Sequence, residues 1–428
     1  MRYADALEYI EGISAGKGIV PGLNSIRELC RRLGDPQDKL KFIHIAGTNG
    51  KGSTLAFISS ILMQSGYRVG RYISPTITDY RERFQINGKM ISQSMFATIL
   101  EEVKNACDIM TEEGLDHPTA FEIETAVSFL YFLRKNCDIV VLETGMGGRD
   151  DATNIVSTTV LSVLTTISMD HMQFLGDTLS KITENKCGII KIGVPVVSAA
   201  QNDEVLTVIN RFSEKNNSSL KVINSGAVSD IKYGLNKQSF KLDKERYEIR
   251  LSGVWQIENA ALAVTAANIL NDNGYKMITK ETIKKGLYNT YWPARFQVVR
   301  KKPLLIIDGA HNEDAAVRLR QSIDTYIPEK KKIYIMGMFR DKEVDKVISM
   351  IVKDAVMVFT CQTPNNPRAM KPLELAEHVR EYNPNVTSCD SVDEAVEFAI
   401  SMADDETAVI ACGSLAYLGR ILDIYKVL

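Results

Sequence analysis

The sequence has 428 residues, of which 45% are hydrophobic and 24% charged, and this is an ordinary balance for a globular chain of two or three domains. The formal net charge of −2 gives no support to a general nucleic-acid or membrane-surface role, and no stretch reaches the roughly 18 apolar residues of a membrane span. The seven cysteines form no CxxC pair, and their odd number predicts reduced thiols in a cytoplasmic protein. The five histidines show no zinc-ligand spacing, so we expect any metal ion to be Mg²⁺ held by oxygen atoms.

The chain opens with an amphipathic helical pattern rather than the apolar core of a signal peptide. Short apolar runs then alternate with helical patterns from about residue 40 to 200 and again from about 304 to 425. The runs predicted as strands are Phe42–Ala46, Asp138–Leu142, Val160–Thr165, Leu304–Ile307, Lys332–Met336 and Ala408–Ala411. This alternation predicts an α/β fold with a mostly parallel sheet in each of two domains.

The middle of the chain follows a different pattern. Residues 219–255 alternate polar and apolar side chains, and we expect them to form a few antiparallel strands appended to the first domain. An alanine-rich helix is predicted from Glu258 to about Leu270. The segment Tyr291–Arg295 interrupts the periodicity with Trp-Pro, and we predict the domain boundary there, between residues 1–293 and 294–428.

A glycine-rich turn follows the first predicted strand and precedes a helix predicted from about Ser53 to Gln64. The turn and helix start consist of Gly47, Thr48, Asn49, Gly50, Lys51, Gly52, Ser53 and Thr54. Glycines let backbone N–H groups face phosphate oxygens, and the helix N-terminus adds positive potential. Lys51 would neutralise β- and γ-phosphate charge, and a Ser53 or Thr54 hydroxyl would face a metal ion. The alternative is a plain strand–turn–helix with a solvated lysine.

This turn departs from the strict G-x-x-x-x-G-K-[ST] pattern, because Ile45 replaces the first glycine and Gly52 precedes Ser53. It resembles the ATP loop of the Mur ligase superfamily, and more closely that of the folylpolyglutamate synthase/dihydrofolate synthase family. The similarity recurs in order at Ser74-Pro75, Glu82-Arg83, Ile86–Gly88, Phe121-Glu122 with Thr125-Ala126, Glu143–Arg149 with Asp151–Asn154, Asp170-His171, Leu175-Gly176, Lys186–Ile189, Pro293–Arg295, Asp308–Asn312 and Gly413–Leu415. A single motif of this kind would be weak, but the ordered series is specific.

The resemblance implies an ATP-dependent, ADP-forming ligase that joins L-glutamate to the carboxylate of a folate. ATP would phosphorylate that carboxylate, and the amine of glutamate would attack the resulting acyl phosphate. Residues 1–293 would form a P-loop-type ATPase domain, and residues 294–428 a smaller Rossmann-like glutamate-ligase domain. The sequence leaves open whether dihydropteroate, tetrahydrofolate or both are accepted, how many glutamates are added, and the oligomeric state.

The resemblance also implies a metal centre. Ser74, Glu143 and His171 would bind Mg²⁺, and Lys186 would react with CO₂ to form a carbamate that binds a second Mg²⁺. Together with Lys51, the residues Glu143, His171 and Lys186 would form the catalytic set. Burial of Lys186 on a half-apolar helix would favour the neutral amine that reacts with CO₂. The alternatives are local: caps for Ser74 and Glu143, a loop hydrogen bond for His171, and a snorkelling side chain for Lys186.

The remaining site residues are also implied by the resemblance. The expected ATP contacts outside the loop are Asn259, Arg295 and Asp308, and the expected contacts to the pterin-bearing acceptor are Thr119, Phe121, Glu122, Asp151 and Ala152. His311 and Ser414 would hold the incoming glutamate. Phe121 could equally be a core aromatic, and His311 and Ser414 could be turn caps. Three residues depart from the family pattern, namely Asn185 where Glu is usual, Asp150 at an apolar position, and Thr76 where His or Phe is common.

Two other functions remain as alternatives. One is a different Mur-type ligase that adds an amino acid to a UDP-sugar peptide. Such ligases usually carry an additional N-terminal domain of about 100 residues, for which a loop beginning at Gly47 leaves no room. The other is a nucleotide-dependent binding protein without ligase activity, in which the acceptor and glutamate motifs would have no purpose.

Overall fold

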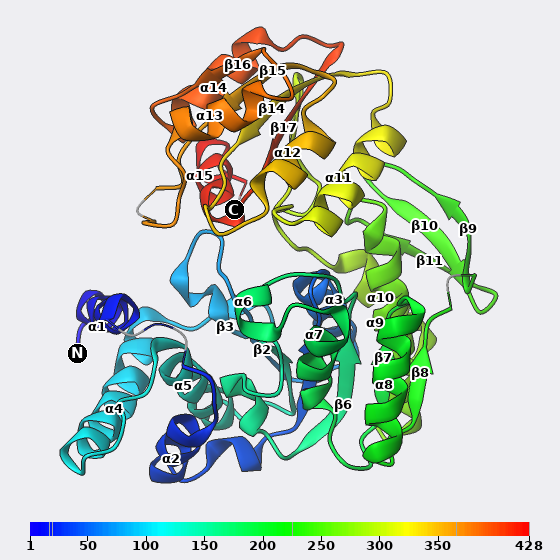
Figure 1. Ribbon diagram of the computed structural model, residues 1–428. Coiled ribbons are helices and arrows are strands. Elements are labelled where there is room, and N and C mark those ends of the chain that lie inside the picture. The colour runs from blue at the N-terminus through cyan, green and yellow to red at the C-terminus, as the bar shows by residue number, and fades with distance from the viewer. Residues whose placement is uncertain (17, 19, 225, 365, 428) are drawn as a thin grey trace. The chain divides into compact units, whose positions relative to one another are not determined.

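The computed structural model describes residues 1–16, 18, 20–224, 226–364 and 366–427 (Figure 1). The chain forms two compact units, which do not follow a single cut in the sequence. The N-terminal unit comprises Met1–Thr76, Tyr80–Ala227 and Asn259–Asn289, and the C-terminal unit comprises Ile77–Asp79, Val228–Glu258 and Thr290–Leu428. The helix α9 (Trp255–Asp272) contributes residues to both units.

The N-terminal unit is built on an eight-stranded sheet with the order β4-β3-β2-β5-β1-β6-β7-β8. The strands are β1 Phe42–Ala46, β2 Val69–Tyr72, β3 Phe84–Ile86, β4 Lys89–Met90, β5 Ile139–Glu143, β6 Thr159–Leu164, β7 Val196–Ser198 and β8 Leu220–Val222. All neighbouring pairs from β2 to β8 in this order are parallel, while β3 and β4 form an antiparallel edge. Every residue of β1 and β5 is buried, as expected for central strands covered on both faces.

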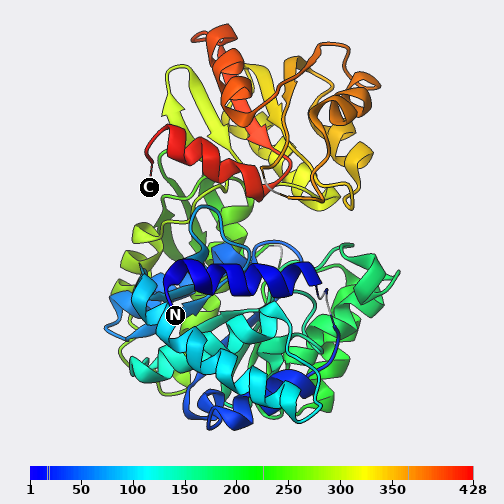
Figure 2. The same cartoon turned by 90° about the vertical axis from the view of Figure 1, so that its left-hand side faces the viewer.

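Helices surround this sheet. They are α1 Tyr3–Gly16, α2 Asn24–Arg32, α3 Lys51–Gln64, α4 Gln93–Glu112, α5 Ala120–Arg134, α6 Met172–Leu175, α7 Leu179–Lys186, α8 Asp203–Lys215, α9 and α10 Lys280–Asn289, with 3₁₀ turns η1 Pro36–Lys39, η2 Tyr80–Arg83, η3 Ala152–Ile155 and η4 Cys187–Ile189. One hydrophobic cluster joins α1, α2, α4 and α5 to the sheet, as Phe42 and Phe129 illustrate with ring centroids 5.5 Å apart. Figure 2 shows α1 lying across α4.

Helices α3 and α10 pack closely, and Gly286 makes this possible. A Cβ atom at Gly286 would lie 2.5 Å from the Cα of Ile61, so a side chain there would push two backbones apart. We expect Gly286→Ala to lower the free energy of unfolding by about 1–3 kcal/mol, as overpacking does. Urea unfolding would measure this, with Gly12→Ala as the control, because a Cβ atom at Gly12 in α1 would meet nothing within 4 Å. Equal effects of the two substitutions would contradict this packing.

The C-terminal unit contains a six-stranded sheet with the order β12-β13-β17-β14-β15-β16, in which only the edge strand β12 is antiparallel. The strands are β12 Gln297–Lys301, β13 Leu304–Ile307, β14 Lys331–Met336, β15 Ala355–Thr360, β16 Val386–Ser388 and β17 Thr407–Cys412. The helices are α11 Glu313–Tyr326, α12 Val344–Ile351, α13 Pro372–Arg380, α14 Val392–Met402 and α15 Leu415–Ile424. One hydrophobic cluster includes residues of α11, α12 and α13, and a second includes residues of α14 and α15.

The third sheet is a small antiparallel one, formed by β9 Val228–Lys232, β10 Gln238–Leu242 and β11 Glu245–Ile249. We expected it to belong with the first domain, but its residues cluster with the C-terminal unit. The reason is side-chain contact: the Tyr326 hydroxyl donates to Gln238 Oε1, and the backbone N–H of Val254 donates to Ser322 Oγ at 3.0 Å. The expected run also included β8, which instead extends the parallel sheet of the N-terminal unit.

The predicted α/β class with mostly parallel sheets in two parts is confirmed, and all six predicted strands are present within one residue of their expected ends. Among the residues that the structure describes, none of the helices has both the length and the hydropathy needed to cross a membrane. All seven cysteines are free thiols.

Candidate active site

The glycine-rich turn lies between β1 and α3 and is fixed by the segment that follows β6. The backbone N–H groups of Thr48 and Asn49 donate to Thr166 O at 2.8 and 3.3 Å. The Thr48 hydroxyl donates to Ser168 O at 3.0 Å and accepts from Ser168 N at 3.1 Å. These bonds hold the turn in a fixed shape at the carboxyl end of the central strand, which is where ligands bind in open α/β sheets.

Two positions of the turn, Gly47 and Gly50, have no room for a side chain because other residues lie close to their backbone. A Cβ atom at Gly47 would lie 1.8 Å from Thr165 Oγ1. Gly50 has φ +85°, and its Cβ would lie 2.5 Å from Oδ1 of Asn259, a nearly buried residue of α9. The structure therefore brings Asn259 beside the turn, and its contact with ATP stays a prediction.

Lys51 begins α3 and turns its side chain back over the loop. Its Nζ donates to the carbonyl oxygens of Gly47 and Thr48, both at 3.3 Å. Ser53 and Thr54 are buried in the first helical turn, and the Thr54 hydroxyl has no hydrogen-bond partner within the described part of the chain. An ammonium group, a helix N-terminus and hydroxyls thus surround one loop, and this combination suits a phosphate with its counter-ion.

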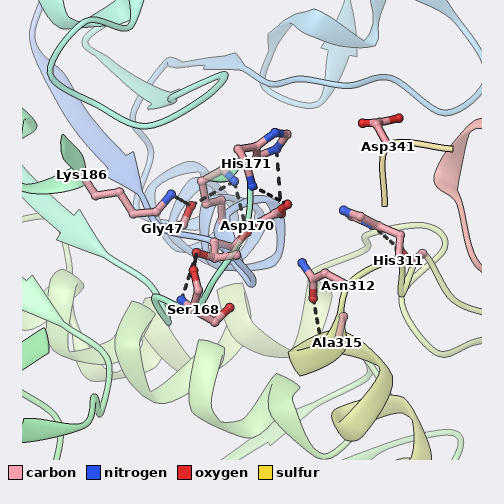
Figure 3. Close-up of polar contacts among 12 residues, drawn as sticks. Gly47, Ser168, Asp170, His171, Lys186, His311, Asn312, Ala315 and Asp341 are labelled. Atoms are coloured by element: carbon pink, nitrogen blue, oxygen red, sulfur yellow. Dashed lines mark hydrogen bonds and ion pairs between the residues drawn. The ribbon is translucent and has the colours of Figure 1, made fainter. Parts of the chain in front are cut away.

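Lys186 is the last residue of α7 and is 4% exposed. Its Nζ donates to Gly47 O at 2.8 Å, so it points at the same carbonyl as Lys51 (Figure 3). Burial lowers the pKa of Lys186 to about 7, and the nearby positive charge of Lys51 acts in the same direction, while Asp170 and Asp151 oppose it. A large fraction of this amine is therefore neutral near pH 7, unlike that of an ordinary lysine.

Glu143 ends β5, next to β1 in the sheet. Ile45 pairs with Glu143, and Thr144 N donates to Ile45 O at 3.0 Å, so this carboxylate lies one strand away from the glycine-rich turn. Glu143 is 5% exposed. Ser74 follows β2, the neighbour of β5 on its other side, and is half-buried.

His171 stands at the start of α6 with a left-handed backbone of φ 50°. Its backbone N–H donates to Asp170 Oδ1 at 2.9 Å, and its Nε2 lies 3.8 Å from Asp170 Oδ2 (Figure 3). Within the described ranges, no three His, Cys, Asp or Glu side chains are grouped as metal ligands. A metal ion here would therefore depend on one or two carboxylates together with hydroxyls and phosphate oxygens, which is the ligand set that Mg²⁺ commonly takes.

Thr119 and Glu122 form a capping box at the start of α5. Glu122 Oε2 accepts from Thr119 N at 2.7 Å and from Thr119 Oγ1 at 2.8 Å, and its Oε1 accepts from Ile26 N at 3.2 Å. Both carboxylate oxygens of this nearly buried residue already bind protein donors. Glu122 thus ties α2 to α5, a local role that the sequence did not suggest.

The Phe121 ring lies over the backbone of Gly145, where a Cβ atom would be 2.5 Å from the ring. It also packs near Tyr72, with ring centroids 6.0 Å apart, and remains half-buried. Asp151 and Ala152 are buried at the start of η3, and Asp151 Oδ2 accepts from Met146 N at 2.8 Å. Asp151, Ala152 and the backbone of Gly145 that the Phe121 ring covers therefore all lie in the segment 145–152.

In the C-terminal unit, Asp308 follows β13 and is 3% exposed. Its Oδ2 accepts from Phe296 N and its Oδ1 from Ala310 N, both at 2.8 Å. Burial raises the pKa of Asp308 to about 6, although Arg295 and these two backbone donors act in the opposite direction. The carboxylate thus fixes the backbone next to Arg295 and next to Gly309.

His311 and Ser414 lie past the ends of the neighbouring strands β13 and β17. Gly413 N donates to Ala310 O at 2.9 Å, which joins the two loops. His311 Nδ1 donates to Gly309 O at 2.8 Å, and Figure 3 shows Asn312 beside it bonded to Ala315. Ser414 caps α15 by accepting from Ala416 N at 3.3 Å.

The three departures from the family pattern have different surroundings. Asn185 Oδ1 is buried against Gly147, whose Cβ would lie 2.2 Å away, and it has no hydrogen-bond partner among the described residues. Asp150 is exposed, and Thr76 is half-buried in the loop after β2.

Several residues that shape this site were not predicted from the sequence. They are Thr165, Thr166 and Ser168 behind the glycine-rich turn, and His44 and Thr153 behind Asp151. A signal existed for the first group, since hydroxyl residues recur at and just after the end of the predicted strand Val160–Thr165. Thr153 lies within the motif Asp151–Asn154, which gave it no role of its own, and its contact with His44 joins residues 109 positions apart in the chain.

Family profiles match both parts of the chain. The profile described as the Mur ligase middle domain matches residues 45–267, and that of the Mur ligase glutamate ligase domain matches residues 294–415. The dihydrofolate synthase/folylpolyglutamate synthase of Bacillus subtilis (strain 168) is 34% identical over 426 residues, covering 98% of each chain. The enzyme of the same description from Escherichia coli (strain K12) is 30% identical, covering 98% of this chain and 95% of that one.

Solved structures agree with these matches. A Mycobacterium tuberculosis folylpolyglutamate synthase complexed with ADP and AMPPCP superposes with a TM-score of 0.90 at 26% identity, covering 99% of each chain. Escherichia coli FolC in complex with DHPP and ADP gives a TM-score of 0.87 at 28% identity, covering 100% of this chain and 98% of that one.

Proposed function

The chain belongs to the folylpolyglutamate synthase/dihydrofolate synthase family of Mur ligases, and we propose on that basis that it joins L-glutamate to the carboxylate of a folate with conversion of ATP to ADP. The observation that carries this proposal is the loop Gly47–Thr54, on which Lys51, Lys186 and Asn259 converge. Relatives described as folylpolyglutamate or dihydrofolate synthases align over nearly the whole chain, which supports the same activity here.

The reaction proceeds in two displacements. An oxygen of the acceptor carboxylate attacks the γ-phosphorus of ATP, the bond to the ADP oxygen breaks, and an acyl phosphate forms. The amine of glutamate then attacks the acyl carbon, the C–O bond breaks, inorganic phosphate leaves and the nitrogen loses a proton. Lys51 and the N-terminal amides of α3 stabilise the charge on the transferred phosphoryl group, because they are fixed before the reaction begins.

Mg²⁺ fits the donor set of the N-terminal unit, which offers the buried Glu143 carboxylate, the Thr54 hydroxyl, to which no described residue bonds, and the predicted ligands Ser74 and His171. When bound, the ion neutralises phosphate charge and polarises the phosphoryl oxygens. The unmodified Lys186 ammonium would repel it. We therefore propose that Lys186 is carbamylated: its amine attacks CO₂, a proton is released, and an anionic oxygen donor replaces a cation. The buried, partly neutral amine supports this proposal.

For glutamate, we propose that His311 and Ser414 hold the carboxylates of the incoming amino acid. Support comes from their joined loops and from the N-terminus of α15, where backbone dipoles favour an anion. We expect His311→Ala and Ser414→Ala to raise the KM for glutamate about tenfold or more, with little change in the KM for ATP, as loss of a charge-assisted hydrogen bond predicts. Initial rates of ADP release at varied glutamate and ATP would measure both constants.

Ser414 also caps its helix, so a matched control is needed. Ser391 caps α14 in the same unit by accepting from Glu394 N at 3.1 Å, and Ser391→Ala removes a cap without touching the loops of β13 and β17. Both serine variants should lose about 1 kcal/mol of stability. If Ser391→Ala raised the KM for glutamate as much as Ser414→Ala, the glutamate assignment would fail.

The substrate class is tested by ADP release with glutamate and a panel of dihydropteroate, tetrahydrofolate and UDP-sugar peptide. We expect release that requires both glutamate and a folate-type acceptor. Activity with the UDP-sugar peptide alone would support the other Mur-type ligase, and nucleotide binding without acceptor-dependent release would support the binding protein.

We propose a cytoplasmic location, which the seven free thiols support, and a functional boundary near residue 293, which the two matched family profiles support.

A further inference from the structure

A chain of hydrogen bonds links the central strand of the N-terminal sheet to Asp151. His44 lies in the middle of β1 with no exposed surface, and its Nε2 is 2.9 Å from Thr153 Oγ1. The same hydroxyl lies 2.5 Å from Asp151 Oδ1. Thr153 belongs to η3, so a strand residue reaches Asp151 through one intervening side chain.

The hydrogen bonds in this series all have the same direction, in which His44 donates to Thr153 and Thr153 donates to Asp151. The Asp151 carboxylate accepts from Thr153 N at 3.1 Å and from Met146 N at 2.8 Å as well as from the Thr153 hydroxyl, and such a set of donors favours its ionised form against the burial that raises its pKa. A hydroxyl has one proton to donate, so Thr153 can only accept from His44, whose Nε2 must then carry hydrogen.

The His44 ring agrees with this direction. Its Nδ1 is buried without a hydrogen-bond partner in the described part of the chain, which fits a nitrogen that carries no proton. Burial lowers the pKa of His44 to about 3, and the charge of Lys191 acts in the same direction, so the ring is neutral at physiological pH. A neutral Nε2–H tautomer is the form that can donate to Thr153.

We propose that His44 and Thr153 are positioning residues that act through Asp151 to fix the backbone of the segment 145–152 against the heterocyclic ring of the acceptor. This inference rests on the proposed function, in which the segment with Asp151 and Ala152 contacts the pterin-bearing substrate. The Asp151 carboxylate accepts from Thr153 on one oxygen and from Met146 on the other, and the backbone of Gly145 also bonds to it, so it ties both ends of the segment together.

Stability alone does not account for the pair. Burying an imidazole whose Nδ1 has no partner among the described residues costs free energy in a strand whose other residues are apolar, and a leucine would fill the position without that cost. His44 therefore contributes something other than core packing, and the hydrogen bond of its ring leads to Thr153 and Asp151.

The test compares two pairs of variants in the full chain. Thr153→Val and His44→Leu break the hydrogen-bond chain, while Thr153→Ser keeps the hydroxyl and His44→Gln keeps an N–H donor near the position of Nε2. We expect the first of each pair to raise the KM for the folate or dihydropteroate acceptor about tenfold, as loss of an orienting hydrogen bond predicts. The KM for ATP and kcat should change little, and the second of each pair should recover most of the lost affinity.

Two further readouts exclude a general loss of structure. Nitrogen-15 NMR of the labelled imidazole should show the Nε2–H tautomer of His44 in the wild type. The His44 signal is identified by its loss in His44→Gln. The same signal should shift in Thr153→Val. Thr360→Val removes a buried hydroxyl that donates to Pro372 O at 2.7 Å in the C-terminal unit, so it should reduce stability without raising the acceptor KM.

An active wild type whose acceptor KM is unchanged by Thr153→Val and His44→Leu would overturn the inference. A protonated Nδ1 in the wild type would also overturn it. These outcomes differ from failure of the proposed function, in which the wild type itself would release no ADP with any folate-type acceptor.

Discussion

Lys51→Ala should lower kcat by about 10³-fold and leave the fold intact. Removal of one preorganised donor from a phosphoryl-transfer or oxyanion site typically costs about 10²–10³-fold, and Lys51 is the loop's own ammonium group. Its Nζ donates to two carbonyls of the same loop rather than to distant parts of the fold, so stability should hardly change. Acceptor-dependent ADP release and urea unfolding would measure the two effects.

Lys285→Ala is a suitable control for this substitution. Lys285 lies on α10 of the same unit, is exposed, and pairs with Glu281 one helical turn away, at 2.7 Å. It should keep normal turnover. Full activity of a correctly folded Lys51→Ala protein would remove the phosphate-loop assignment.

Lys186→Ala should be nearly inactive, and a short-chain carboxylic acid such as acetate should restore part of the activity by supplying the missing anionic oxygen. The wild type should also depend on CO₂. Because the pKa of Lys186 is lowered to about 7, its neutral amine becomes more abundant as pH rises through 7, and carbamate formation rises with it. Activity should therefore be lost in CO₂-free buffer at mildly acidic pH and regained with bicarbonate at higher pH.

A second buried lysine provides the matched control for Lys186. Burial lowers the pKa of Lys191 to about 8, and its Nζ donates to Asn154 Oδ1 at 2.8 Å. Acetate should not rescue Lys191→Ala, because the amine of Lys191 holds a side-chain amide rather than the loop carbonyl of Gly47. Mass analysis under gentle conditions that found only a free amine on Lys186 in the active enzyme would contradict the carbamate.

The parts of the fold that could be predicted from the sequence are those set by local pattern. The strands β1, β5 and β6 are short apolar runs next to turn residues, and α3 follows a glycine-rich turn, so neighbours in sequence determine each of them. The fold class and the family followed from such patterns, and both are confirmed.

The parts that could not be predicted depend on long-range contacts. The small sheet clusters with the C-terminal unit through the Gln238–Tyr326 contact, which no local periodicity reveals. The prediction that Glu122 contacts the acceptor stays a prediction, and the sequence does not reveal that its oxygens bind Thr119 and the backbone of Ile26, 96 residues away in the chain. The nucleotide contact of Asp308 likewise stays a prediction, and its hydrogen bonds to the backbone of Phe296 and Ala310 could not be read from the sequence. Motifs indicate that such residues matter without showing what they touch.

The central claim is that ATP activates the acceptor carboxylate as an acyl phosphate before glutamate attacks. It is tested most directly by supplying a folate or dihydropteroate whose carboxylate oxygens are oxygen-18, together with ATP and glutamate, and analysing the released phosphate by mass. The account predicts one labelled oxygen in each phosphate and one amide bond formed for each ADP, because the bridging oxygen leaves with phosphorus. Phosphate without label during steady formation of the glutamylated product would contradict it.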